Sequence, residues 1–121
     1  MNRKTLGILA VAIAASIAAF LLVQQPDSSH KATTRTLALT VQNQAVVGGK
    51  QSLTVNKGDT VKLTVTSDVA AEVHVHGVEA MKDVTAGGTI ELDFKVSVDG
   101  VFPVELHSDP ELKLATLTIN P

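Results

Sequence analysis

The sequence predicts an all-β domain, a sandwich of about seven short strands, and three observations indicate this class. From Arg35 onward, apolar residues recur at every second position, which is the period of a half-buried strand. Turn-forming residues interrupt this alternation about every ten residues. Thr and Val, which favour strands, are frequent in the alternating segments, and none of these segments has the period of an amphipathic helix.

The expected strands follow one another with their apolar side chains on one face. They are TLALTVQ (36–42), QSLTVN (51–56), TVKLTVTSD (60–68), AEVHVHG (71–77), TIELDFKV (89–96), VFPVELH (101–107) and LKLATLTIN (112–120). Between the fifth and sixth segments stands Asp99-Gly100, a dipeptide typical of two-residue β-hairpin turns. The sequence therefore predicts a hairpin at that point.

An uncharged apolar run, LGILAVAIAASIAAFLLV, extends from Leu6 to Val23. It is at the short end of the ~20 residues that a membrane-spanning helix needs. The basic residues Arg3 and Lys4 precede it, which predicts a cytoplasmic N-terminus and an exported remainder. A cleaved signal peptide and an uncleaved signal anchor both remain open. The anchor is favoured because the small-x-small sites lie inside the run rather than after it.

Residues 24–34, QQPDSSHKATT, are polar and hold little that a core could bury. They predict a flexible tether, and His30 within them is interpreted as a solvated side chain. The expected organisation is a signal anchor or signal peptide at 1–23, the tether at 24–34 and one domain at 35–121. Such a chain is a single-pass protein of the cell membrane with its domain outside the cytoplasm, or a periplasmic or secreted protein if the leader is cleaved.

The composition excludes several classes of function. Removing the positive charges of Arg3 and Lys4 from the net charge of −2 leaves −4 on the remainder, the opposite of a nucleic-acid binder. The chain has no cysteine, so disulfides, thiolate metal sites and a cysteine nucleophile are excluded. A Gly-rich phosphate loop and a G-x-S-x-G elbow are also absent, and no catalytic site is predicted.

Three histidines of the domain are candidate metal ligands. His74 and His76 are two residues apart on one expected strand, so both point to the same face. His107 ends a later strand, near one end of the sandwich. Neutral imidazole is a common ligand of copper, zinc and nickel, so this trio predicts a metal site. The alternative is that these histidines are solvent-exposed, or held by backbone groups, with no metal.

Four other side chains near these histidines deserve consideration as ligands. Glu72, Glu79 and Glu105 are expected to be solvated charges, and Glu105, which shares the face of His107, is the best of them as an auxiliary ligand. Met81 follows the His-x-His strand. A methionine thioether can bind copper, but a single methionine more commonly serves in packing.

The alternation of side chains along the strands predicts which way the histidines point. If Val73 and Val75 face the core, then His74 and His76 lie on the outside of the sheet. The same parity places His107 outside if Leu106 is inside. A metal site buried inside the sandwich needs an inward histidine, so this prediction opposes a buried site.

The stretch from Ser67 to Ile119 resembles the C-terminal half of a cupredoxin, and NKGDTVKLTVTSD resembles the entry strand of that family. Gly100-Val101-Phe102-Pro103-Val104-Glu105-Leu106 matches the pattern G-x-[YF]-x-[YV]-x-C, with Leu106 in place of the ligand cysteine. The resemblance covers about residues 35–121 and implies a cupredoxin-like Greek-key β-sandwich. The missing cysteine, and the lack of His and Met between Ser108 and Lys113, argue against a blue-copper centre.

Two functions follow from these observations. The first is a membrane-tethered, exported metal-binding module that holds copper as Cu(II) through His74, His76 and His107, for metal handling rather than electron transfer. Its partners are a metal ion and an exported or membrane protein. The alternative is a metal-free β-sandwich that binds a partner protein at the membrane.

Overall fold

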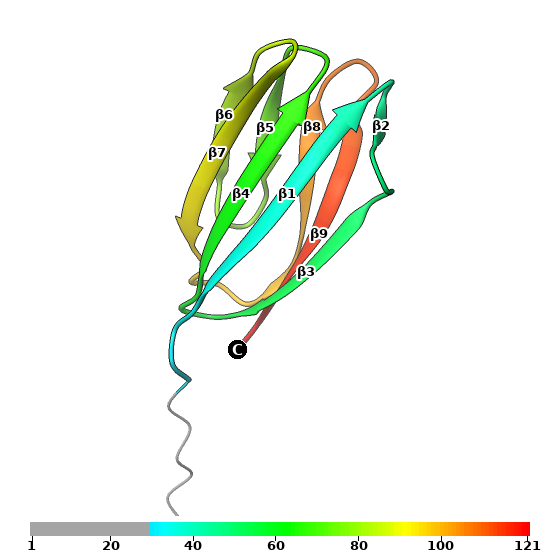
Figure 1. Cartoon of the computed structure of the whole chain (residues 1–121). Helices are drawn as coiled ribbons and strands as arrows, with labels where there is room; N and C mark the ends of the chain where they lie inside the picture. The colour runs from blue at the N-terminus through cyan, green and yellow to red at the C-terminus, as the bar shows by residue number, and fades with distance from the viewer. Residues whose placement is uncertain (1–29) are drawn as a thin grey trace, which may run out of the picture. The chain divides into compact units, whose positions relative to one another are not determined.

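The computed structural model describes residues 30–121, and in this part of the chain it contains nine strands and no helix. Two sheets pack face to face (Figure 1). The four-stranded sheet has the order β2-β1-β4-β7 and comprises β1 (Thr34–Gln42), β2 (Ala45–Val46), β4 (Thr60–Ser67) and β7 (Gly88–Lys95). The five-stranded sheet has the order β3-β9-β8-β5-β6 and comprises β3 (Gln51–Asn56), β5 (Ala71–Val75), β6 (Ala80–Val84), β8 (Gly100–His107) and β9 (Leu112–Asn120). The predicted all-β sandwich is confirmed.

The core forms because inward side chains alternate with outward polar ones. On β4, Val61, Leu63 and Val65 are buried, while Lys62 between them is exposed. The same alternation buries one face of β1, β3, β8 and β9. Aliphatic residues make up this core, which explains how a domain with few aromatic residues closes.

Two strands were missed by the sequence reading, and one connection was predicted wrongly. β2 has only two residues, and the middle of β6 is exposed, so neither shows a clear alternation. Asp99-Gly100 does not form a hairpin, because β7 and β8 lie in different sheets. A turn dipeptide specifies a chain reversal but not the strand that the chain then joins. β8 instead pairs with β5 and β9.

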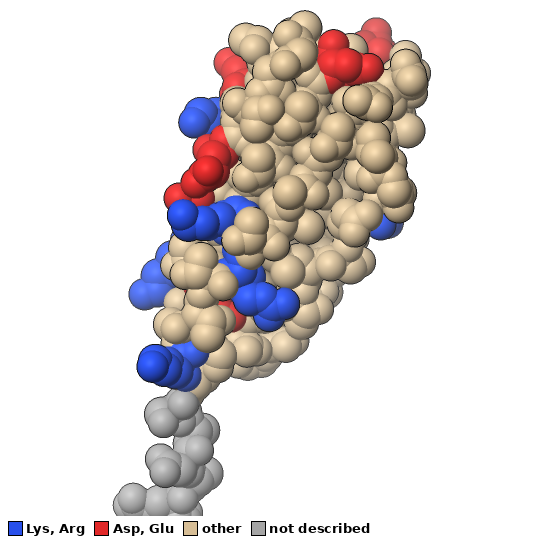
Figure 2. All heavy atoms as spheres, viewed as in Figure 1, with Lys and Arg blue, Asp and Glu red and all other residues tan. Residues whose placement is uncertain are grey.

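Charged residues on the outside contribute little to holding the sandwich. Lys57 and Asp99 lie 3.5 Å apart, and Lys62 and Asp93 lie 3.9 Å apart, with all four side chains about half exposed. Such pairs are worth ~0–1 kcal/mol each. Figure 2 shows Lys and Arg gathered toward the end of the domain where β1 begins, with Asp and Glu prominent toward the other end.

The ordered domain begins slightly before Arg35. β1 starts at Thr34, and the backbone N–H of Thr33 donates to Asp59 Oδ1 at 2.9 Å. Among residues 30–121 there is no helix long and apolar enough to cross a membrane. The expected span at 6–23 lies outside the described residues.

Candidate metal centre

The three histidines lie on adjacent antiparallel strands of the five-stranded sheet. Strand β5 carries His74 and continues directly to His76, and β8 ends at His107. The register sets Glu72 opposite His107 and His74 opposite Glu105. These strands therefore bring together residues that are about thirty positions apart in the sequence.

The histidines lie on the outer face of this sheet, as the parity argument predicted. Val73 and Val75 are fully buried, so His74 between them points away from the core. Leu106 is also fully buried, and the next residue, His107, points outward with a side chain 38% exposed. The sandwich interior thus holds none of these three imidazoles.

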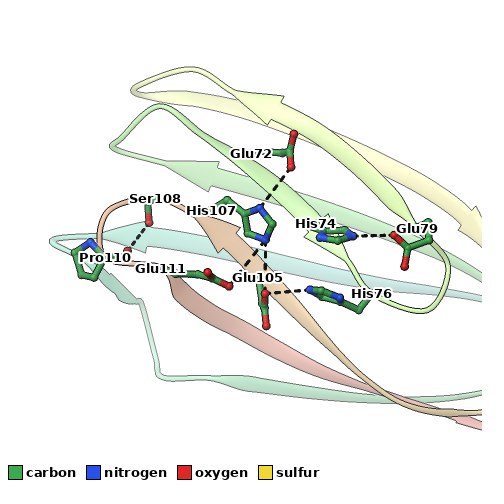
Figure 3. A network of polar contacts seen from close by, with 9 residues as sticks. All are labelled: Glu72, His74, His76, Glu79, Glu105, His107, Ser108, Pro110 and Glu111. Atoms are coloured by element: carbon green, nitrogen blue, oxygen red, sulfur yellow. Dashed lines mark hydrogen bonds and ion pairs between the residues drawn. The ribbon is translucent and has the colours of Figure 1, made fainter.

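The three imidazoles converge (Figure 3). The ring centroids of His74 and His76 are 4.0 Å apart, and those of His74 and His107 are 5.2 Å apart and nearly perpendicular. One ring nitrogen from each histidine lies within 4.8 Å of the other two. Because metal–nitrogen bonds are ~2 Å long, small side-chain rotations would bring these nitrogens around one ion.

Each histidine also contacts a carboxylate. His74 Nε2 lies 3.1 Å from Glu79 Oε2, and His76 Nε2 lies 3.0 Å from Glu105 Oε2. Glu79 and Glu105 therefore have histidine partners, whereas the sequence analysis expected solvated charges; Glu79 is nevertheless 67% exposed. Histidines that bind metals commonly donate their second N–H to such a carboxylate, which fixes the tautomer and the ring orientation.

Glu72 performs the equivalent role for the third histidine. Its Oε1 lies 3.5 Å from His107 Nδ1. The opposite nitrogen, His107 Nε2, faces two carboxylates, Glu105 Oε2 at 3.6 Å and Glu111 Oε1 at 3.9 Å. Contact with Glu72 through Nδ1 leaves Nε2 as the ligand nitrogen of this ring.

His74 provides the strongest sign of a ligand site. Its side chain is 12% exposed, and its Nδ1 is buried with no hydrogen-bond partner among the described residues. When Nε2 donates its proton to Glu79, Nδ1 holds a free lone pair. Leaving such a buried acceptor unsatisfied is unfavourable by ~1–3 kcal/mol. A metal ion bound at Nδ1 would satisfy it.

Glu111 joins this group, and the sequence analysis did not select it. It forms a second potential ligand set with Glu105 and His107. A hydrogen bond between the Glu105 and Glu111 carboxyls lowers the pKa of Glu105 and raises the pKa of Glu111. The hydrogen bond from His76 lowers the pKa of Glu105 further. The spacing of four residues between His107 and Glu111 was the available signal, but it has meaning only once the loop conformation is known.

The turn between β5 and β6 positions Glu79. Glu79 has φ of +52°, an uncommon value for a residue with a side chain, and Gly77 has φ of +83°. Gly77 lies against the ring of Phe102, with no room for a β-carbon. This close approach holds the turn against β8 and places the Glu79 carboxylate beside His74.

Comparisons with known proteins identify the fold. No protein-family model matches the chain, and no curated protein matches it by sequence. Copper nitrite reductase from Nitrosomonas europaea superimposes with a TM-score of 0.61 at 19% identity, over 73% of this chain and 42% of that chain. A laccase from Botrytis aclada gives 0.63 at 18% identity, over 78% of this chain and 24% of that chain. The protein thus spans less than half the length of these two enzymes.

A third structure matches along nearly the whole chain. It belongs to a heme-copper terminal oxidase dimer, with a TM-score of 0.60 at 17% identity, over 98% of this chain and all of that chain. The domain has the cupredoxin fold. The sequence resemblance to cupredoxins is thereby confirmed.

A cupredoxin-type thiolate site does not fit this chain. Leu106, which takes the place of the ligand cysteine, is fully buried in the core. Leu106 lines a hollow of about 220 Å³. Its lining, which includes Val41, Leu106 and Leu112, contains no histidine or methionine. The candidate ligands are instead on the outer face of β5 and β8.

Proposed function

We propose that this cupredoxin-like domain is a binding module for Cu(II), not an enzyme, and that His74, His76 and His107 hold the ion. The unpartnered, buried Nδ1 of His74 beside two further imidazoles is the observation that carries this proposal. A site with nitrogen and oxygen ligands suits metal handling better than the fast electron transfer of a copper–thiolate centre.

Copper is favoured over other divalent ions for two reasons. Cu(II) binds nitrogen and oxygen sites more tightly than Zn²⁺ or Ni²⁺ in the general order of divalent metals. The structural neighbours also include a copper nitrite reductase and a copper binding protein. We expect Zn²⁺ to bind at the same place with lower affinity.

The carboxylates orient the ligands in this proposal. Glu79 accepts a hydrogen bond from Nε2 of His74, and the Glu72 carboxylate lies 3.5 Å from Nδ1 of His107, so the other nitrogen of each ring is left for the ion. Glu105 is the auxiliary oxygen ligand, since it reaches both His76 and His107. Ligand histidines must be neutral, so affinity should fall as the solution is made more acidic.

Titration calorimetry with Cu(II) on the full-length chain in detergent tests the site. The double variant His74→Ala/His76→Ala should bind roughly a hundredfold more weakly, because two of three nitrogen ligands are lost. His107→Ala should weaken binding less. His30→Ala is the matched control, since His30 lies outside the group, and should retain the wild-type affinity.

The outcomes separate the alternatives. Equal affinity in the wild type and the double variant would show that the assignment of the site is wrong. No binding in the wild type would favour the metal-free module that binds a partner protein. Full affinity in His107→Ala would reduce the site to the two histidines of the β5 region.

We also propose that residues 6–23 tether the domain to a membrane, with the domain outside the cytoplasm. The charge asymmetry created by Arg3 and Lys4 supports this orientation. A reporter that is active only in the cytoplasm, fused after Pro121, should be inactive. Strong reporter activity would contradict the topology.

A further inference from the structure

We propose that the Met81 thioether is an additional donor of this site and gives it affinity for Cu(I) as well as Cu(II). The inference rests on the proposed copper function and extends it to the second oxidation state of the ion. It begins from a row of three side chains across neighbouring strands: Met81 on β6, His74 on β5 and Glu105 on β8.

The strand register places Met81 and Glu105 on opposite sides of the same histidine. His74 is paired with Met81 in β6 and with Glu105 in β8, both antiparallel. Residues directly opposite each other in antiparallel strands project from the same face, with Cβ atoms ~4.5–5.5 Å apart. His74 therefore has a thioether as one lateral neighbour and a carboxylate as the other.

Alternation along β6 confirms that Met81 faces outward. Val84 is buried and pairs with Ala71, while Ala80 pairs with the fully buried Val75. These residues fix the inward face of β6, so Met81 projects from the outer face with His74. The residue lies on an edge strand of the described sheet, where nothing pairs beyond it.

Packing does not account for Met81. Its side chain is 52% exposed, and it is one of the few large apolar residues of the described domain that water reaches. Ala80 and Val84 of the same strand pack in or against the core, but Met81 does not. A hydrophobic side chain in this position gains little from burial, and its flexible thioether is free to reach a neighbouring ion.

The two neighbours of His74 in this row are ligands of different hardness, a thioether on β6 and a carboxylate on β8. Thioether ligands favour Cu(I), whereas carboxylates suit harder ions such as Cu(II). His74, in the middle, is a suitable ligand for both. We therefore expect Cu(I) to bind between His74, His76 and Met81, and Cu(II) to bind the three histidines with Glu105 as the oxygen ligand.

Competition with the Cu(I) chelator bathocuproine disulfonate, without oxygen, tests the inference on the full-length chain. Met81→Leu removes the sulfur and keeps a side chain of similar volume. This variant should bind Cu(I) about tenfold more weakly or worse, and it should bind Cu(II) within about twofold of the wild type. Val101→Leu is the control, because Val101 is exposed on the same sheet and away from the histidines.

X-ray absorption on the Cu(I)-loaded protein provides a direct measurement. The wild type should show a copper–sulfur shell, and Met81→Leu should lose it. The chain has no cysteine, and its only other methionine is Met1. A sulfur shell that persists in Met81→Leu would contradict the assignment to Met81.

The failures of the two proposals are distinguishable. If Cu(II) binds through the histidines but Met81→Leu leaves Cu(I) affinity unchanged, only the role of Met81 is overturned. If the wild type binds neither ion, both proposals are overturned.

Discussion

The inner and outer sides of the β5–β8 strand pair differ in every property that matters for metal binding. On the inner side, Val73, Val75 and Leu106 are fully buried and provide no ligand atom. On the outer side, three imidazoles and their carboxylates converge. Because side chains alternate with a period of two, a ligand one position later in a strand belongs to the opposite face. His107 after Leu106 is such a case.

The residues that build the fold and the candidate metal ligands therefore occupy opposite faces of the same two strands. At the inner position of β8, Leu106 is fully buried and completes the core. The outer face does not pack against the other sheet, so polar side chains can lie there without disturbing the core. Variants on each side can show whether changes on one side leave the other unaffected.

The largest expected effect is on the inner side. Leu106→Cys removes buried volume and should lower the free energy of unfolding by about 2–4 kcal/mol, measured by chemical denaturation. The new thiol has no histidine beside it in the hollow, so added Cu(II) should give no intense thiolate-to-copper band in the visible spectrum. Cu(II) affinity at the outer site should stay near that of the wild type. An intense band would show that the inner site can still assemble.

A second variant changes the turn between β5 and β6. Gly77→Ala places a β-carbon against the Phe102 ring and forces a side chain into positive φ. We expect the free energy of unfolding to fall by about 2 kcal/mol and the Cu(II) affinity to fall with it, because this turn carries Glu79. Gly87→Ala is the control, since Gly87 also has positive φ but open space around it. Equal effects of the two variants would show that backbone strain alone, and not the Phe102 contact, is responsible.

The sandwich was predictable from sequence because burial imposes a strict alternation. The alternating buried residues Val61, Leu63 and Val65 predict their strand, whereas the exposed Met81-Lys82-Asp83 of β6 shows no such alternation. The outward direction of His74 followed from the same parity. What the sequence could not supply was the register between β5 and β8, which sets Glu72 opposite His107.

The carboxylate partners of the site depend on contacts that are distant in sequence or on loop conformation. Glu105 on β8 contacts His76 just after the end of the neighbouring strand β5. Glu111 lies near His107 only because of the conformation of the loop between β8 and β9. The positive φ of Glu79 has no sequence signal either, because such conformations are usual for Gly and Asn. Candidate ligands were therefore found from residue type and spacing, and their partners were not.

A smaller effect is expected at the outer site when its orienting carboxylate is neutralised. Glu79→Gln keeps the length of the side chain but removes the charge that favours the Nε2–H tautomer of His74. Cu(II) affinity should fall about tenfold in calorimetry, as for other residues that orient ligand histidines. Glu91→Gln, on the four-stranded sheet, should bind like the wild type. No loss in Glu79→Gln would mean that the ring of His74 is oriented by its packing alone.

The smallest effect concerns the metal-free protein and its dependence on pH. The hydrogen bond with His74 lowers the pKa of Glu79 from its ordinary value of 4.5. A carboxyl whose pKa is lower in the folded state stabilises the fold above the unfolded value, and this contribution disappears as pH falls through the folded value. The difference in unfolding free energy between the wild type and Glu79→Gln should therefore be small but measurable at neutral pH, and it should disappear as pH falls through the lowered pKa of Glu79. Because Glu79 is exposed, salt should reduce the difference at neutral pH. A difference that grew on acidification would show that the contact between Glu79 and His74 does not stabilise the outer face in its charged form.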